Sequence, residues 1–456
     1  MRFVGREDDL RILEREYENR GSFVVIYGRR RVGKTTLISE FIRNKKSIYF
    51  SAGTLPDAEN MRKFSDSVAD HLNLKDTSFK SWEAAFGSIA DRNEKTVVVL
   101  DEFQYLAQAN PGFPSIMQGV WDRILKDRGV MLIICGSFMG MMEKYALNHS
   151  SPLYGRRTAN IKLGPLNFRD VKEAFPGIGF RALMELYAVT GGIPRYLELF
   201  DGNASFRENV RRLILDRRGA LHEEPLFLLG SEIREPINYV SILEAIALGN
   251  SKMSAITGRL GVPSSSVSPY LRTLEDMELV RRAVPATESN PLRSKSGSYK
   301  ISDGLTAFWF RFVHPYRNYL DIGSIGEVER ILDEHLIDGF VSFAFEELCR
   351  TMTYLLCGDI GISFTKVGAY WDRNTEIDVV AVDARNKRIF AAECKYSANK
   401  VTLSVYNDLK EKCSRVGAFD GYEVRLGLFS VSGFDENLIR KAEEDGSLLI
   451  RADEVF

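Results

Sequence analysis

Short apolar runs alternate with amphipathic segments along the first third of the chain. Four of the runs have the length and β-branched content of buried strands: residues 23–27, 48–51, 96–100 and 130–135. Apolar residues recur at helical spacing in the segments that precede or separate them: 10–17, 34–44, 57–72 and 82–92. Strands that alternate with helices form parallel sheets with helices on both faces. The pattern therefore predicts a doubly wound α/β domain.

From residue 164 the apolar spacing becomes mainly helical. Three short helical patterns then follow one another, at 239–247, 253–261 and 264–279. A basic strand at 280–285 and a return strand at 299–301 come next. Three helices followed by a two-stranded wing predict a winged helix-turn-helix.

A further αβ pattern begins near residue 335, with apolar strands at 376–382 and 388–396. The 456 residues are enough for about three domains of ~150 residues each. We expect boundaries near 230 and 325, although no Pro- or Gly-rich linker marks them.

Composition narrows the class of protein only in part. The net charge is −1, so any nucleic-acid surface must be a local patch. The five cysteines are scattered without a Cys-x-x-Cys pair, which fits a reducing compartment and predicts neither disulfides nor a zinc site. No apolar run approaches the ~18 residues of a membrane span, and the N-terminus has no signal-peptide core. We therefore expect a soluble, cytoplasmic protein without a membrane partner.

The first predicted strand leads into Gly28-x-x-x-x-Gly33-Lys34-Thr35, the spacing of a phosphate-binding loop. The glycines let consecutive backbone N–H groups surround an anion, and the following helix start adds further donors. Lys34 is expected to reach the β- and γ-phosphates, and the Thr35 hydroxyl to bind Mg²⁺. A glycine turn with a chance Lys-Thr is the alternative, but a strand before and a helix after favour nucleotide binding. The residues expected at the nucleotide are Gly28, Arg31, Val32, Gly33, Lys34, Thr35 and Thr36.

Acidic and hydroxyl side chains follow the next two strands of this domain. Asp101 is expected to hold Mg²⁺, and Glu102 to orient or deprotonate the attacking water. An acidic pair after a strand can also be a helix cap or a solvated turn. Ser137 ends the following strand, where its hydroxyl would sense the γ-phosphate or simply belong to a turn.

Arg156 and Arg157 form the next candidate. A guanidinium presented to the γ-phosphate of another subunit would stabilise charge in the transition state. This reading predicts a homo-oligomer that forms through Arg156 and Arg157. An ordinary surface arginine pair is the alternative.

Together these motifs resemble the archaeal-type ATPases, prokaryotic relatives of the STAND and AAA+ proteins. The resemblance spans essentially the whole chain and is specific for the ATPase half, in segments 28–35, 101–102, 152–157 and 191–194. It implies that Val4, Gly5 and Arg6 cradle the adenine, and that Pro194 lies in a Gly-x-Pro element of a helical lid. It also implies a sheet in which the Ser137 strand lies between the phosphate-loop strand and the Asp101 strand.

The helix-turn-helix region is locally basic. Residues 252–300 hold eight Lys or Arg against four Asp or Glu. The third helix is expected to expose Arg272 and the serines Ser264, Ser265, Ser266 and Ser268, which suit phosphate and base contacts. Arg281 and Arg282 of the wing are expected to contact DNA phosphates. A winged helix that only packs on protein is the alternative.

Charged residues interrupt the two apolar strands of the C-terminal region. Asp378 on one strand and Glu393-x-Lys395 on the next resemble the PD-(D/E)xK nuclease pattern, although Ile377 replaces the usual proline. Asp378 and Glu393 would ligate Mg²⁺, and Lys395 would position the attacking water. Glu346 resembles the first acid of that fold. A salt-bridged structural hairpin in a degenerate nuclease fold is the alternative.

The register of this hairpin follows from its length. A tip at Arg385-Asn386 pairs Asp378 with Glu393 and Glu376 with Lys395, which sends all four side chains to one face. A slip of one residue would send the acids of one strand to the opposite face.

The sequence thus predicts an α/β protein with four domains. These are a P-loop ATPase core with a parallel sheet (1–163), a helical lid (164–230), a winged helix-turn-helix (231–325) and a C-terminal α/β restriction-endonuclease-like domain (326–456). We expect ATP and Mg²⁺ as cofactors and DNA as a partner, cleaved at a site that nucleotide state controls. Two alternatives stay open: a nucleotide-switched DNA-binding regulator with an inactive nuclease fold, and a chaperone-like ATPase that binds protein partners.

Overall fold

The computed structural model describes residues 2–233 and 235–456. Their contacts divide the chain into two compact units, and each is described by itself. The first unit runs to Asp170 and also takes in Ile193–Glu198, while the second holds Val171–Gly192 and Leu199–Phe456. The four-domain division stays a prediction.

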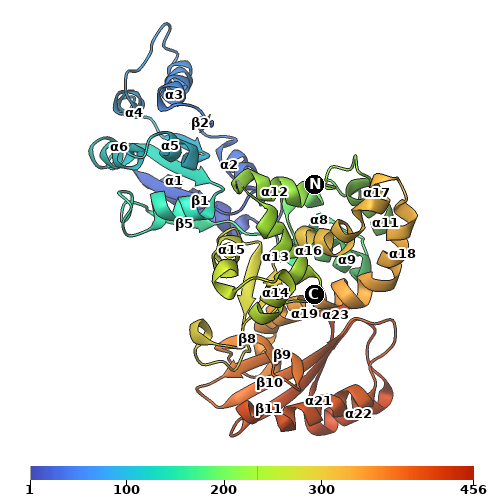
Figure 1. The fold of residues 1–456 in the computed structure, drawn as a ribbon. Coiled ribbons are helices and arrows are strands. Elements are labelled where there is room, and N and C mark those ends of the chain that lie inside the picture. The colour runs from blue at the N-terminus through green and yellow to red at the C-terminus, as the bar shows by residue number, and fades with distance from the viewer. Residues whose placement is uncertain (1, 234) are drawn as a thin grey trace. The chain divides into compact units, whose positions relative to one another are not determined.

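A five-stranded sheet organises the first unit (Figure 1). Its strands are β1 (Ser22–Tyr27), β2 (Ser47–Ser51), β3 (Thr96–Asp101), β4 (Val130–Gly136) and β5 (Ala159–Lys162). All neighbours pair in parallel, in the order β2-β3-β4-β1-β5. The β4 strand, which ends next to Ser137, therefore lies between the phosphate-loop strand and the Asp101 strand. This confirms the order implied by the family resemblance.

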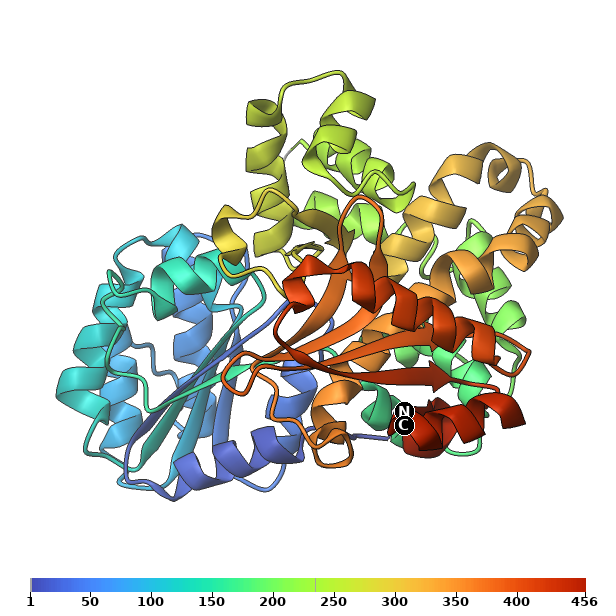
Figure 2. The same cartoon turned by 90° about the horizontal axis from the view of Figure 1, so that it is seen from below.

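Helices cover both faces of this sheet (Figure 2). Every residue of β3 and β4 is buried, which explains why these strands are continuous apolar runs. An aromatic cluster that includes Phe64, Trp82 and Phe113 fills one side. The helices of this unit are α1 (Glu7–Glu18), α2 (Lys34–Ile42), α3 (Asp57–His71), α4 (Trp82–Ala90), α5 (Phe103–Ala109), α6 (Phe113–Val120), α7 (Met139–Met142) and α10 (Pro194–Leu197), while α8 (Phe168–Ala174) spans the boundary.

The edge strand β5 was not predicted from the sequence. It has only four residues, of which Ile161 alone is buried. Four residues are too few to show a clear period of two, so β5 can be identified as a strand only from its pairing with β1.

Helices dominate the first part of the second unit. They are α9 (Phe180–Thr190), α11 (Phe206–Val210), α12 (Glu224–Glu232), α13 (Ile237–Ala247), α14 (Met253–Leu260), α15 (Ser264–Asp276), α16 (Gly304–Phe312), α17 (Arg317–Asp321), α18 (Ile325–Leu336), α19 (Ser342–Thr353) and α20 (Cys357–Ile360). Helices α13 to α15 are followed by β6 (Val280–Ala283) and β7 (Ser298–Ile301), which pair antiparallel. The predicted three helices and wing are therefore present. Val267, Leu271 and Leu274 recur at helical spacing along α15, and all three are buried.

A second five-stranded sheet, in the order β12-β11-β10-β9-β8, closes the chain. Its strands are β8 (Lys366–Trp371), β9 (Glu376–Asp383), β10 (Arg388–Lys395), β11 (Glu423–Ser430) and β12 (Leu448–Arg451). Strands β8 to β10 pair antiparallel, and β10 to β12 pair in parallel. Helices α21 (Leu403–Arg415) and α22 (Glu436–Asp445) run across one face of this sheet (Figure 2), and α23 (Ala452–Val455) ends the chain.

The β9–β10 hairpin has the predicted register. Its pairs run from Asp383 with Arg388 to Val379 with Ala392. The ladder described for this hairpin ends there, so the pairing of Asp378 with Glu393 and of Glu376 with Lys395 stays a prediction. Beyond the ladder, the Asp378 carboxylate accepts the Cys394 backbone N–H at 2.8 Å. The hairpin loop is longer than the predicted two residues, but it is lengthened equally on both sides, so the register is kept.

Candidate active site

The phosphate loop connects β1 to α2 and has the backbone that its glycines permit. Gly33 has φ 90°, and Arg31 also lies in the left-handed region at 72°. A Cβ on Gly28 would come within 2.1 Å of the Leu163 carbonyl oxygen, so no larger residue fits there. The Lys34 ammonium donates across the loop to the carbonyls of Gly28 and Arg29, at 2.8 and 2.9 Å. Burial lowers the pKa of Lys34.

Oxygen atoms converge at the adjoining end of β3. The Thr35 hydroxyl lies 3.4 Å from Asp101 Oδ2, and the Tyr49 hydroxyl donates to the same oxygen. Burial, followed by the charge of Asp101, raises the pKa of Tyr49. A hydroxyl and a carboxylate are hard donors of the kind that Mg²⁺ takes beside phosphate oxygens and water. Among residues 2–233 and 235–456, no three His, Cys, Asp or Glu side chains form a ready-made metal cluster.

Glu102 follows Asp101 and is the N-cap of helix α5, where its backbone is left-handed, with φ 55°. Its carboxylate accepts a hydrogen bond from the Ser137 hydroxyl at 2.9 Å and another from the Gln104 amide. Its backbone N–H donates to Asp101 Oδ1 at 2.8 Å. The structure thus brings the predicted residues Glu102 and Ser137 into contact.

The N-terminal segment packs against the phosphate loop. The Arg6 guanidinium donates to the carbonyls of Val32 and Gly164, at 3.0 and 2.6 Å. Val4 is buried, and Gly5 takes φ 67° where a Cβ would come within 2.4 Å of Asp170. Arg6 therefore contacts the phosphate loop directly. A contact of Val4, Gly5 and Arg6 with adenine stays a prediction.

The Gly-x-Pro element also reaches the loop. A Cβ on Gly33 would lie 3.7 Å from Pro194 Cγ, and the Arg195 N–H donates to the Arg31 carbonyl at 3.4 Å. The Arg31 guanidinium lies over the Tyr196 ring, 6.0 Å from its centroid. Thr36 stays exposed in the first turn of α2.

Arg156 and Arg157 are held within their own chain. Arg156 forms a three-bond ion pair with Asp122, with distances of 2.9–3.0 Å. Arg157 donates to the Asn160 side chain at 3.1 Å and to the Leu147 carbonyl at 3.3 Å. A role at another subunit stays a prediction, and it requires Arg156 to leave Asp122.

The third helix and the wing of the helix-turn-helix have different surroundings. On α15, Ser264, Ser265, Ser266, Ser268 and Arg272 are all exposed, as predicted. On the wing, Arg281 forms an ion pair with Glu347 of α19 at 2.6 Å. Arg282 donates to the carbonyls of Pro291 and Ser294, at 2.8 and 2.5 Å. Arg281 thus contacts a helix outside the wing, whereas Arg282 contacts the loop of its own wing. The packing role that the sequence left open as an alternative fits Arg281.

The loop after β6 extends this docking along strand β8. The Ala286 N–H donates to the Ala369 carbonyl at 2.8 Å, and the buried Ala286 side chain joins the core of the C-terminal sheet. Lys366 reaches the carbonyls of Pro285 and Glu288, at 3.3 and 3.2 Å. The wing is thus attached to the C-terminal module by main-chain, side-chain and apolar contacts.

The predicted C-terminal acids lie in one cluster of charges. Glu346 of α19 lies 3.5 Å from Arg350, which also donates to the Asp378 carbonyl at 2.7 Å. Burial, then the charge of Asp378, raises the pKa of Glu346. Burial, then the charge of Glu393, raises the pKa of Asp378.

Both carboxylate oxygens of Glu393, the third acid in this cluster, accept hydrogen bonds from lysines. The nearly buried Glu393 accepts from Lys412 of α21 at 2.7 Å and from Lys395 at 3.3 Å. Asp378 is engaged with the Cys394 N–H. Aspartate and glutamate oxygens suit Mg²⁺, but in this arrangement an ammonium group already neutralises one of the two proposed ligands.

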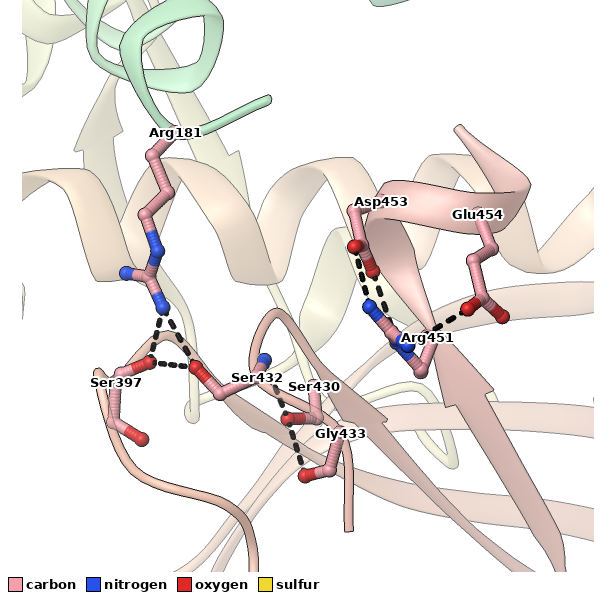
Figure 3. Close-up of polar contacts among 8 residues, drawn as sticks. All are labelled: Arg181, Ser397, Ser430, Ser432, Gly433, Arg451, Asp453 and Glu454. Carbon is pink, nitrogen blue, oxygen red and sulfur yellow. Dashed lines mark hydrogen bonds and ion pairs between the residues drawn. The ribbon is translucent and has the colours of Figure 1, made fainter. Parts of the chain in front are cut away.

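A contact from α9 fixes the loops that follow β10 and β11 (Figure 3). Arg181 donates to the Ser397 carbonyl at 2.5 Å and to the Ser432 hydroxyl at 2.7 Å. Ser397 lies just beyond Lys395, so a helix that the sequence assigned to the lid orders the loop next to the acid cluster.

Sequence reasoning missed several residues of these sites. The Tyr49 and Asp101 side chains lie on the same face of the sheet. Their proximity can be inferred only when the pairing of β2 with β3 is known. Gln104 lies two residues after Glu102 on a helix that was not predicted. Lys412 lies on a helix that sequence analysis did not outline, and nothing local connects it to Glu393.

Comparison with known proteins agrees with this geometry. Residues 3–200 match an ATPase domain found predominantly in Archaea. Residues 238–283 match the IclR helix-turn-helix domain, and residues 309–407 match archaeal and bacterial proteins of unknown function. No described helix is long and apolar enough to cross a membrane.

Individual relatives extend the match along the chain. The uncharacterized protein MJECL04 of Methanocaldococcus jannaschii is 34% identical over 426 residues, which cover 92% of this chain and 94% of that protein. The uncharacterized ATP-binding protein MJ0423 of the same organism is 53% identical over 45 residues, 10% of this chain and 76% of that one. The Walker-type ATPase PABY2304 of Pyrococcus abyssi has a similar fold, with a TM-score of 0.53 and 23% identity over 68% of this chain and 96% of that one.

The fold and site define a P-loop ATPase with a helix-turn-helix region. The chain belongs to the same family as MJECL04, and it carries an ATPase domain of the kind found predominantly in Archaea.

Proposed function

We propose that this protein hydrolyses ATP with Mg²⁺ and uses its nucleotide state to control how it engages DNA. The observation that carries the hydrolytic part is the convergence of Lys34, Thr35, Asp101 and Glu102, with Thr35 and Asp101 3.4 Å apart. When bound, Mg²⁺ would supply charge neutralisation at the β- and γ-phosphates from Thr35 and Asp101.

The chain's own groups have separate tasks in this reaction. Lys34 would leave the carbonyls of Gly28 and Arg29 for the phosphates, since an ammonium binds a phosphate more strongly than neutral carbonyls. Glu102 would orient a water for attack on the γ-phosphorus and take its proton, while the bond to the ADP oxygen breaks. Ser137 lies beside Glu102 and would donate to the γ-phosphate.

The test is phosphate release measured together with nucleotide binding. The wild-type protein should release phosphate from ATP in the presence of Mg²⁺, and Lys34→Ala should lose tight binding of ATP. Equal ATP affinity in the two proteins would contradict the proposal that this loop binds the phosphates of ATP.

The helix-turn-helix favours DNA as the partner. Helix α15 exposes Arg272 and a row of serines, groups that suit phosphate and base contacts. With the wing arginines engaged on protein, we propose that DNA is contacted through α15. Retention on DNA that falls as salt rises supports this proposal, while retention only on protein partners supports the chaperone-like alternative.

A second candidate activity is metal-dependent DNA cleavage at the C-terminal acid cluster. It is favoured by the arrangement of Glu346 on a helix, Asp378 on the next-to-edge strand β9, and Glu393 with Lys395 on β10. It requires Lys412 to release Glu393. Plasmid nicking with Mg²⁺ or Mn²⁺, with and without ATP, tests it against Asp378→Asn, and wild-type inactivity under all conditions supports a regulator with an inactive nuclease fold.

We also retain the proposal that Arg156 or Arg157 acts across a homo-oligomer. It would place a guanidinium at the γ-phosphate bound by a neighbouring copy. The cytoplasmic location expected from the sequence stays part of the proposed function.

A further inference from the structure

The amide of Gln104 is one of two side-chain groups that hold the Glu102 carboxylate. Gln104 lies on α5, two residues after Glu102, and has no exposed surface. Its Nε2 donates to Glu102 Oε2 and lies 3.4 Å from Ser137 Oγ. The Ser137 hydroxyl donates to the same carboxylate oxygen at 2.9 Å. The end of β3, helix α5 and the residue after β4 thus meet at one carboxylate oxygen.

Chemistry fixes the orientation of this amide. An ionised carboxylate only accepts hydrogen bonds, so the nitrogen of Gln104 must face Glu102 and its oxygen must face away. The oxygen lies where a side chain at Gly136 would be, because a Cβ there would come within 2.6 Å of it. Among the groups that the structure describes, Gln104 Oε1 has no hydrogen-bond partner.

A buried acceptor without a partner is unfavourable, whereas an apolar side chain of similar shape would avoid this cost. Packing alone therefore does not explain an amide at position 104. The neighbouring backbone carries a second local cost, because Glu102 is a non-glycine residue at φ 55°. The unpartnered amide oxygen and the left-handed backbone are thus both close to the Glu102 carboxylate, the proposed base.

We infer that Gln104 is a positioning residue that holds Glu102 for the attack of water on ATP. The inference rests on the proposed role of Glu102 and adds a residue to it. When the Ser137 hydroxyl turns toward a γ-phosphate, Glu102 loses one of its two side-chain donors. The buried Gln104 amide then remains to keep the carboxylate in place, so Gln104 affects turnover and not nucleotide affinity.

The test compares Gln104→Leu with Gln108→Leu in the full chain. Gln108 lies one turn further along the same helix and is exposed, and its amide donates to the Met141 sulfur at 3.3 Å. For each variant, kcat, the Kd for ATP and the melting temperature are measured. Gln104→Leu should lower kcat by about 10- to 100-fold, a part of what a general base contributes. Its Kd for ATP should stay unchanged, and its melting temperature should be equal or higher, while Gln108→Leu should match the wild type.

Two results would overturn the inference: an unchanged kcat in Gln104→Leu, or a fall in kcat that comes with weaker ATP binding and a lower melting temperature. Gln104→Glu keeps the size of the side chain but replaces the donor by a second carboxylate, and it should also lower kcat with an unchanged Kd. Glu102→Gln serves as the reference. If Glu102→Gln turns over like the wild type, the proposed role of Glu102 itself fails. If only Glu102→Gln is impaired, the role of Gln104 alone fails.

Discussion

Arg281 of the wing is ion-paired with Glu347 of helix α19, with Nη2 and Oε2 2.6 Å apart. Glu347 also accepts from Arg350 at 3.0 Å, and Arg350 in turn donates to the Asp378 carbonyl. Three side chains therefore connect the wing to the strand that carries a proposed metal ligand. The winged helix and the C-terminal module are joined at the point where the sequence predicts a DNA contact.

This pairing changes what Arg281 is expected to do. Arg281→Gln should leave the salt dependence of DNA binding unchanged, because the guanidinium is engaged by Glu347. The free energy of unfolding should fall by only about 0.5 kcal/mol, since both side chains are more than one-third exposed and water screens their charges. A double-mutant cycle with Glu347→Gln measures the pair, and a salt slope that falls by about one unit in Arg281→Gln would return this residue to the DNA contact.

Arg272 of α15 is an exposed arginine of the same helix-turn-helix region, and it serves as the comparison for Arg281. Arg272→Ala should weaken binding to duplex DNA and lower the slope of log affinity against log salt by about one unit, because one phosphate contact is lost. Binding measured between low and moderate salt checks this. An affinity and a slope equal to those of the wild type would locate the DNA surface away from α15.

Lys412 is expected to compete with a divalent cation at the acid cluster. Its ammonium lies 2.7 Å from Glu393, so Lys412→Met should strengthen Mn²⁺ binding severalfold by leaving the carboxylate available. Lys410→Met is the control, because Lys410 lies on the same helix but pairs with Asp445. Calorimetric titration with Mn²⁺ compares the two. Equal Mn²⁺ affinity in both variants and the wild type would show that Lys412 does not occupy the ion's position.

Action of Arg156 across subunits makes a kinetic prediction. ATPase activity per chain should rise with protein concentration, and Arg156→Ala mixed with Lys34→Ala should recover part of the activity that each lacks. Asp122→Asn should favour the same state, because it releases Arg156 from its ion pair. A rate per chain that is independent of concentration, measured on a monomer, rules the arrangement out.

The features that could be predicted from the sequence are those fixed by local spacing. Gly28, Gly33 and Lys34 are close in the chain, and a loop of this length between a strand and a helix has few alternatives. The β9–β10 register was predictable for the same reason, because a short hairpin fixes which residues face each other. Strand β4 could be placed beside β1 only through the family resemblance.

What could not be predicted depends on contacts between distant segments. Tyr49 meets Asp101 only because β2 and β3 are adjacent, and Lys412 meets Glu393 only because α21 packs on the sheet. The wing had the basic character of a DNA arm, but its composition could not reveal that Ala286 and Arg281 find partners in a segment sixty or more residues away. The basic sequence of the wing is compatible with a DNA contact or with a protein contact. Only the packing of distant segments shows that Arg281 and Ala286 contact protein.

The most direct test of the proposed catalytic site is the behaviour of Glu102→Gln. The substitution keeps the size of the side chain, so position 102 can still contact Ser137 and Gln104. It removes the carboxylate that would act as the base. ATP affinity and single-turnover hydrolysis are measured on the same preparation, with Mg²⁺ present. We predict ATP binding equal to that of the wild type and a hydrolysis rate lower by at least about 100-fold. Hydrolysis at the wild-type rate would contradict the assignment of Glu102, and with it the catalytic site described for this ATPase.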